Sequence, residues 1–140
     1  MGIAEKLTTL ERRQMKYAIS GSSGFVGRTL GERLEQFKPL KRNGFIPDDI
    51  EVVFDLAAYG NMAGHKAEPY EVYKANTLRV AKALECIKGS DTRFIYMSTS
   101  SVTLPKQTFY SASKKATEEM IKVAVEDWGI NAVIVRPYTV

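Results

Sequence analysis

The stretch that most constrains the fold of this chain is residues 16–27, KYAISGSSGFVG. Its apolar residues 17–19 predict a buried strand, and the helical spacing of Val26, Leu30, Leu34 and Phe37 predicts an amphipathic helix directly after it. Between the two lie three glycines in the pattern G-x-x-G-x-x-G: Gly21, Gly24 and Gly27. Such glycines allow a tight turn, a close approach of the backbone to a pyrophosphate, and close contact between helix and strand, while the helix N-terminus attracts phosphate. The stretch therefore predicts a nucleotide-binding loop, with a plain glycine-rich turn as the alternative.

The composition is that of a globular protein, and it argues against several other classes. The 140 residues are 44% hydrophobic and 26% charged, as in one domain with a real core. The net charge of +4 is spread among acidic residues, which does not favour binding to nucleic acid. A single cysteine, Cys86, excludes an internal disulfide, and a single histidine, His65, gives no support for a metal site. No long apolar run or signal peptide is present, so we expect a cytoplasmic protein without membrane contact.

The rest of the chain alternates between predicted strands and helices. Residues 1–15 are expected to form an N-terminal tail, and residues 16–140 a single domain. After the first strand–helix unit we expect an edge strand within 37–42, a strand within 51–58, a helix over 69–88, a strand over 93–98, a helix from Phe109 or Ser111 to Trp128, and a strand over 131–135. This alternation predicts the α/β class, with a doubly wound parallel sheet that carries helices on both faces.

Two residues at the start of the last long helix suggest acid/base chemistry. Tyr110 and Lys114 belong to the sequence Y-S-A-S-K and lie four apart, on one face of the helix. A nearby ammonium lowers the pKa of a tyrosine, which suits a general acid/base for alcohol–ketone interconversion. We expect the opposite stripe to face the core; its members are Ala112, Ala116, Met120 and Val123. The alternative is a common surface pair without a role.

A cluster of hydroxyl groups follows the preceding strand, as Ser98-Thr99-Ser100-Ser101. The carboxyl ends of parallel strands face the ligand crevice, so one of these hydroxyls is placed to hydrogen-bond a substrate oxygen. For Ser100 and Ser101 the alternative is turn formation or helix capping.

Four motifs occur in order on the expected elements: GSSGFVG, FDLAA, STSSV and YSASK. This combination resembles the short-chain dehydrogenase/reductase superfamily, and more closely its extended branch of NAD(P)-dependent sugar-nucleotide epimerases, dehydratases and reductases. The resemblance covers about residues 16–140 and implies a Rossmann-like fold, NAD or NADP as cofactor, and hydride transfer at a carbinol or keto carbon of a nucleotide sugar. It also implies that two copies pair through helices 70–88 and 110–128.

The resemblance assigns roles residue by residue. Tyr110 would be the proton donor or acceptor, Lys114 would hold the nicotinamide ribose, and Thr99 would be the catalytic hydroxyl, with Ser98 as the fallback. Ser100 and Tyr110 would contact substrate. The implied cofactor-binding residues are Gly21, Ser23, Gly24, Phe25, Val26, Gly27, Leu56, Ala57, Ala58, Asn76, Ser98, Tyr110, Lys114 and Pro137. For Asn76, which lies on the inward stripe of its helix, a purely structural role is the alternative.

The cofactor type depends on the residues where the second strand ends. A basic residue there suits the 2′-phosphate of NADP, so Lys41 and Arg42 lean towards NADP, with a surface charge pair as the alternative.

The chain also departs from the family pattern. Residues 28–50 are too few for two strand–helix units, so one unit is expected to be missing, and Asp55 stands where such strands often carry histidine. Ser100 and Ser101 replace an acidic pair typical of dehydratases. The chain stops at Val140, where an extended member would continue into its substrate-binding part, which favours a fragment. Two alternative functions are a non-catalytic nucleotide-binding module and a simple carbonyl reductase.

Overall fold

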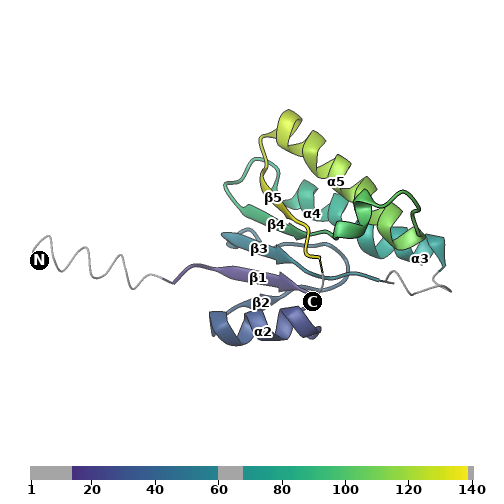
Figure 1. Cartoon of the computed structure of the whole chain (residues 1–140). Coiled ribbons are helices and arrows are strands. Elements are labelled where there is room, and N and C mark those ends of the chain that lie inside the picture. Colours follow the sequence, from purple (N-terminus) through teal and green to yellow (C-terminus); the bar gives the residue numbers. More distant parts are fainter. Residues whose placement is uncertain (1–13, 60–67, 139–140) are drawn as a thin grey trace, which may run out of the picture.

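The structure, a computed structural model, describes residues 14–59 and 68–138 and contains a parallel sheet between two layers of helices (Figure 1). The strands are β1 (Tyr17–Ser20), β2 (Lys38–Pro39), β3 (Val52–Asp55), β4 (Arg93–Met97) and β5 (Asn131–Val135). Their order is β2-β1-β3-β4-β5, and every neighbouring pair is parallel. The predicted Rossmann-like sheet with helices on both faces is therefore confirmed.

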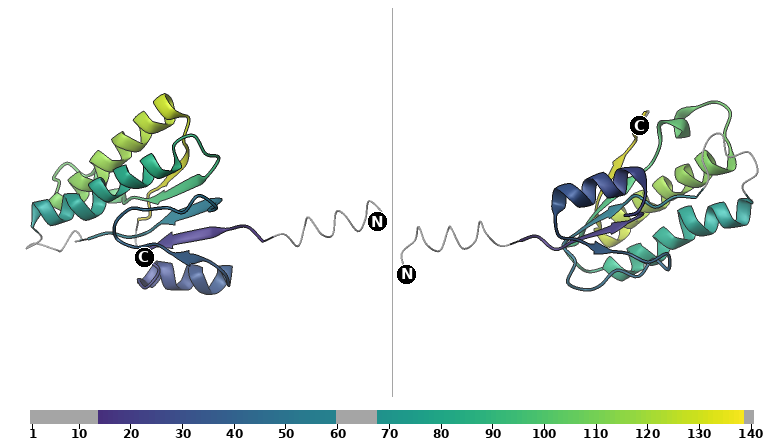
Figure 2. Two further views of the ribbon diagram at one scale, coloured as in Figure 1. Left: turned by 180° about the vertical axis from the view of Figure 1, so that it is seen from behind. Right: turned by 90° about the horizontal axis from the view of Figure 1, so that it is seen from below.

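The helices divide unequally between the two faces of the sheet (Figures 1 and 2). Helix α2 (Phe25–Leu34) lies on one face. The other face carries α3 (Pro69–Tyr73), a π-helical turn η1 (Lys74–Leu78), α4 (Arg79–Ile87) and α5 (Phe109–Trp128). A short 3₁₀ helix, η2 (Ser100–Thr103), follows β4. Within the described residues, no helix is both long enough and apolar enough to cross a membrane.

Helix α2 is shorter than its apolar pattern predicts. It ends at Leu34 because Glu35 adopts a left-handed backbone conformation, with φ of 65°. Phe37 then folds back onto the helix, and a Cβ atom on Gly31 would lie 2.6 Å from its ring. The prediction that Phe37 continues the helix was wrong. The expected edge strand is confirmed, since β2 borders the sheet and contains Pro39, which an edge tolerates.

The connection from β2 to β3 contains no helix. It crosses the face that carries α4, where Ile46 and Ile50 are buried in the core. Gly44 has a φ of 79° and contacts the helix so closely that a Cβ atom would lie 2.5 Å from the carbonyl oxygen of Arg79. This segment takes the place of the strand–helix unit that the sequence predicted to be missing.

The main core lies between the sheet and helices α4 and α5. It joins Val53 and Phe94 of the sheet to Val80 and Leu84 of α4 and Ile121 of α5. Because side chains alternate along a strand, the neighbouring residues face the α2 side. There Phe54, Ile95 and Val133 lie in register on β3, β4 and β5 and remain partly exposed, since α2 is the only described helix on that face.

The helical segment 69–88 is interrupted by the π-helical turn η1. This turn changes which residues face the core, so that Val72 is fully buried and Tyr73 only partly. The expected inward positions Asn76, Val80 and Leu84 are confirmed as buried.

The inward face of α5 differs from the predicted one. Val123 is 55% exposed, and Ala112, Ala116 and Met120 are only partly buried. The buried side instead carries Ser113, Lys114, Thr117, Glu118, Ile121 and Ala124. The prediction was wrong because it assumed that apolar residues would face the core. Polar side chains are buried here instead, because they have hydrogen-bond partners. The Thr117 hydroxyl, for example, donates to the carbonyl oxygens of Asn76 and Ser113.

Candidate functional site

The glycine loop has the geometry that each of its glycines predicts. Gly21 has a φ of 72°, and a Cβ atom there would lie 2.8 Å from the main-chain nitrogen of Ala57. At Gly27 a Cβ atom would lie 2.1 Å from the carbonyl oxygen of Gly21, so only glycine lets α2 approach the loop. Gly24 is exposed and open by comparison, with 3.3 Å to the same oxygen. Gly24 is also the N-cap of α2, and no side chain caps that end, which leaves its N–H groups accessible to an anion.

A cavity of about 400 Å³ opens beside this loop. It brings together seven of the predicted cofactor residues: Gly21, Ser23, Gly24, Arg42, Leu56, Ala57 and Ala58. Lys41 lines it as well, next to Arg42, and both cations are exposed. The other three members of the loop motif are not part of the lining: Gly27 is buried, Val26 is half-buried, and Phe25 is 79% exposed. The loop, the end of β2 and the segment after β3 thus form one pocket, as a dinucleotide site requires.

Three residues at the floor of this pocket form a buried polar network that the sequence analysis missed, and two of them, Ser20 and Arg79, belong to the pocket lining. Asp55 accepts two hydrogen bonds from Arg79, at 2.5 and 2.9 Å, and one from the Ser20 hydroxyl at 2.7 Å. All three side chains are nearly inaccessible to solvent. A signal was present in the sequence: Arg79 is three residues after Asn76 on the inward side of its helix, and a buried arginine needs an acidic partner.

The hydroxyl cluster lies after the carboxyl end of β4. Thr99 caps η2, because its hydroxyl accepts a hydrogen bond from the Ser101 main-chain nitrogen at 3.2 Å and lies 2.9 Å from the Ser101 hydroxyl. The residue that caps η2 is therefore Thr99, which the sequence predicted to be catalytic. Ser98 is 3% exposed, and its buried hydroxyl has no hydrogen-bond partner among the described residues.

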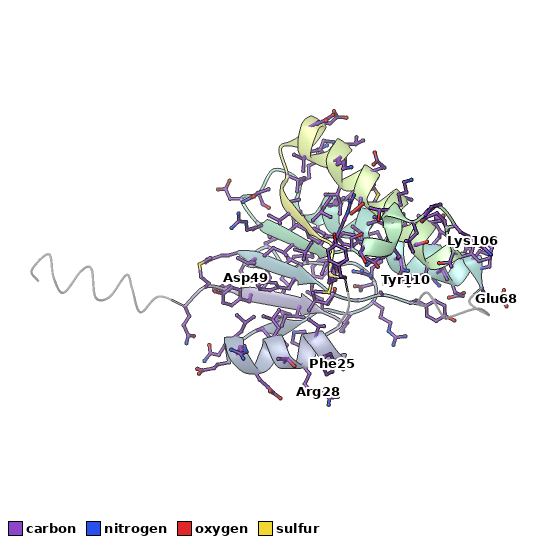
Figure 3. The ribbon with its side chains drawn as sticks, viewed as in Figure 1. Phe25, Arg28, Asp49, Glu68, Lys106 and Tyr110 are labelled. Carbon is purple, nitrogen blue, oxygen red and sulfur yellow. The ribbon has the colours of Figure 1, made fainter. Side chains whose placement is uncertain are left out.

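Tyr110 lies in the first turn of α5, at the end of the sheet towards which the strands run (Figure 3). Phe25 of the glycine loop is at this same end, and Asp49 is at the opposite end (Figure 3). Tyr110 is half-buried, and burial raises the pKa of its phenol. The predicted lowering of this pKa by Lys114 is not found in the structure.

Lys114 is directed into the protein, and its ammonium contacts β4. The Nζ atom donates a 2.6 Å hydrogen bond to the carbonyl oxygen of Met97 and lies 4.4 Å from the centroid of the Tyr96 ring. The side chain is 2% exposed, and burial lowers its pKa to about 8. At neutral pH the ammonium is therefore still mostly charged.

Asn76 is fully buried, and its side-chain amide is engaged by protein atoms. It donates to the carbonyl oxygen of Tyr59 at 3.0 Å and to the hydroxyl of Ser113 at 3.1 Å, and accepts from the nitrogen of Tyr59 at 2.8 Å. Asn76 thus ties the segment after β3 to α5, close to Tyr110. These bonds give the residue a structural role that agrees with one of the two predicted alternatives.

The last described residues close the far side of the site. The carbonyl oxygen of Pro137 accepts a hydrogen bond from the Ser100 nitrogen at 3.2 Å, which places Pro137 and Ser100 side by side. Glu118, which is 1% exposed, forms a two-point ion pair with Arg136, at 2.7 and 2.9 Å. Gly60 and His65 lie outside the described residues.

The chain is similar in sequence to known proteins. Residues 38–140 match the NAD dependent epimerase/dehydratase family, a range that begins after the glycine loop. The chain is 28% identical over 129 residues to a UDP-2-acetamido-2,6-beta-L-arabino-hexul-4-ose reductase of Pseudomonas aeruginosa. The alignment covers 87% of this chain and 35% of that protein.

Solved structures show the same fold at lower identity. UDP-glucuronic acid 4-epimerase from Bacillus cereus, in complex with NAD, has a TM-score of 0.75 at 21% identity, over 89% of this chain and 57% of its own. RMD from Pseudomonas aeruginosa, in complex with NADPH, has a TM-score of 0.74 at 21% identity, over 89% of this chain and 53% of its own. The chain therefore spans about half the length of these structures and about a third of the curated reductase.

Proposed function

Because the chain belongs to the NAD dependent epimerase/dehydratase family, we propose that it is the cofactor-binding part of an enzyme that transfers hydride at a carbinol or keto carbon of a nucleotide sugar. One observation carries the proposal: the glycine-loop pocket and the Tyr110–Lys114 pair lie at the same end of one parallel sheet. A module that only binds nucleotide has no need of that pair. The nucleotide-sugar substrate is supported by the similar proteins, which include a UDP-sugar epimerase and a UDP-sugar reductase.

The pocket residues fit a nicotinamide dinucleotide. The open N-terminus of α2 and the exposed backbone at Gly24 suit a pyrophosphate, and the unpartnered hydroxyl of Ser98 suits a polar group of the cofactor. Lys41 and Arg42, both exposed on the pocket lining, favour the additional phosphate of NADP. When bound, the nicotinamide supplies the hydride acceptor or donor.

The proton is handled by residues of the chain itself. Burial raises the pKa of Tyr110, so its phenol is protonated at neutral pH and can donate to a substrate oxygen as that oxygen gains charge. The mostly charged ammonium of Lys114 is held on the carbonyl oxygen of Met97 at the carboxyl end of β4, where it could hold a hydroxyl group of the bound cofactor. Thr99 would orient the substrate oxygen through its hydroxyl. To do so, the hydroxyl would give up its hydrogen bond with the Ser101 main-chain nitrogen and form one with the substrate oxygen.

Turnover of a nucleotide-sugar panel by the Tyr110→Phe variant tests the proposal. Loss of the general acid in the full-length enzyme should lower turnover at least about 10²-fold. Tyr70→Phe, at a side chain that is 68% exposed on α3, is the matched control and should turn over normally. Normal turnover by Tyr110→Phe would overturn the assigned role. A panel that includes simple ketones also separates the nucleotide-sugar enzyme from a simple carbonyl reductase.

We further propose that two copies pair through the helical face of α4 and α5. Val123 of α5 is 55% exposed, and Phe109 and Leu78 on the same helical layer are also more than half exposed. Sedimentation should show a dimer that Val123→Glu dissociates. Val133→Glu, on the opposite side of the sheet, is the control and should leave the dimer intact.

A further inference from the structure

Asp55 and Arg79 form an almost completely buried ion pair at the floor of the cofactor pocket, where Arg79 belongs to the lining. Asp55, at the end of β3, is 1% exposed, and Arg79, at the start of α4, is 6% exposed. The guanidinium binds the carboxylate at two points, and both side chains are almost inaccessible to solvent. A buried ion pair stabilises a fold poorly compared with apolar residues, so a pair at this position calls for another explanation.

The pair is connected to the pocket wall through main-chain atoms. Arg79 donates a further hydrogen bond, at 3.1 Å, to the carbonyl oxygen of Ala57. Ser20, which donates to Asp55, accepts in turn from the nitrogen atoms of Leu56 and Ala57 at 3.1 and 3.2 Å. Both polar groups of the Ala57 backbone are therefore held by this network.

Ala57 is also the residue against which the glycine loop rests. A Cβ atom on Gly21 would lie 2.8 Å from the nitrogen and 2.9 Å from the Cα atom of Ala57, so loop and wall touch backbone to backbone. Ala57 therefore cannot move closer to Gly21 without displacing the turn, and a shift of Ala57 away from it would open the contact. The network of Ser20, Asp55 and Arg79 thus joins the first turn of the glycine loop to the segment after β3, which contains Ala57.

We propose that Asp55 and Arg79 are positioning residues that hold Ala57 against Gly21, and so set the shape of the pyrophosphate site before the cofactor binds. This inference rests on the proposed function, since it concerns the same pocket. A site that is shaped in advance loses less free energy to ordering when its ligand binds.

The charges of the pair also reach Lys114. Asp55 and Glu118 favour its charged form, Arg79 opposes it, and Tyr96 and Tyr110 are the other titratable groups on that side. Because the two charges of the pair act in opposite directions, removing one of them moves the pKa of Lys114 in a direction that depends on which one is lost. A role limited to filling space has no such signature.

The test compares Asp55→Asn, Arg79→Met and Arg79→Lys in the 140-residue chain. Calorimetric titration with NADP⁺ should show dissociation constants at least tenfold higher for all three. Ile87→Val, a conservative change in the core on α4, is the control for lost stability and should bind as the parent does. Arg79→Lys keeps the charge but cannot bind both Asp55 and Ala57, so it separates geometry from charge.

Two readouts by NMR complete the design. The pKa of Lys114 should fall in Asp55→Asn, rise in Arg79→Met and stay in place in Arg79→Lys. Without cofactor, the amide signals of Gly21 and Ala57 should shift in all three variants. Unchanged amide signals and cofactor affinity, or shifts of the Lys114 pKa in one common direction, would overturn the inference. Failure of the parent chain to bind any nicotinamide nucleotide would instead overturn the proposed function, and the amide signals would still decide the positioning role.

Discussion

The ammonium of Lys114 donates a 2.6 Å hydrogen bond to the main-chain carbonyl oxygen of Met97, the last residue of β4. The bond joins α5 to the carboxyl end of the sheet, and so fixes the helix turn that also carries Tyr110. It leaves the ammonium buried beside the Tyr96 ring, which lies 4.4 Å away. Because this ammonium is buried, we expect it to make the free energy of unfolding depend on pH.

The first prediction concerns Lys114→Met. Burial lowers the pKa of Lys114 from 10.5 to about 8, so the folded chain binds fewer protons than the unfolded chain between these two values. The stabilising contribution of this group is therefore complete above pH 10.5 and is lost as the pH falls through about 8. Relative to Lys114→Met, the free energy of unfolding of the parent chain should rise by about 3 kcal/mol across that interval.

Urea unfolding at several pH values measures this difference, because the other titrating groups cancel between the two chains. The neutral-pH comparison should favour Lys114→Met, since a buried charge is replaced by an apolar side chain of similar length. A difference that does not change between pH 8 and 10.5 would show that the ammonium is solvated in the folded chain.

The second prediction separates two glycines of the same loop. Gly27→Ala places a methyl group 2.1 Å from the Gly21 carbonyl oxygen, inside a buried contact, and should destabilise the fold by about 1–3 kcal/mol or more. Gly24→Ala meets only one atom, at 3.3 Å, and should change stability by less than about 0.5 kcal/mol. Yet Gly24→Ala should weaken NADP⁺ binding at least about tenfold, because its methyl group occupies the approach of the pyrophosphate.

Thermal unfolding and calorimetric titration of both variants give the two quantities. The opposite pattern, with a stable Gly27→Ala and normal binding by Gly24→Ala, would mean that the loop does not hold the cofactor through its backbone.

The order of strands and helices could be predicted because each element carries a local signal. The apolar runs of β1 and β5, the glycine motif and the positive φ at Gly129 all act within a few residues. The short interval between Gly27 and β3 likewise indicated the missing unit. Such features depend little on the rest of the fold.

The errors arose where partners distant in sequence decide the outcome. The inward face of α5 is polar because η1 supplies partners for Ser113 and Thr117, and no apolar count reveals that. The ion pair of Asp55 and Arg79 joins residues 24 apart, and Thr99 became a cap because η2 formed behind it. These are tertiary hydrogen bonds, which a one-dimensional pattern does not encode.

The third prediction addresses the two roles considered for Asn76. Its amide makes three hydrogen bonds to protein groups, so Asn76→Ala leaves buried polar atoms such as the Ser113 hydroxyl with fewer partners. The expected loss of stability is about 1–3 kcal/mol. The dissociation constant for NADP⁺ should change less than in Gly24→Ala. A large loss of affinity at unchanged stability would instead make Asn76 a direct cofactor ligand.

The fourth prediction uses the unequal burial of Glu118 and Arg136. The carboxylate is 2% exposed, whereas the guanidinium is 43% exposed and can be hydrated without its partner. Arg136→Met therefore leaves a buried carboxylate unpaired, but Glu118→Gln leaves only an exposed cation facing an amide that can still accept a hydrogen bond. Arg136→Met should lower the unfolding midpoint more than Glu118→Gln. Thermal unfolding of both variants checks this order. Equal decreases of the unfolding midpoint in the two variants would show that water reaches the Glu118 carboxylate. The end of β5 would then be held by the hydrogen bonds of the strand and not by the ion pair of Glu118 and Arg136.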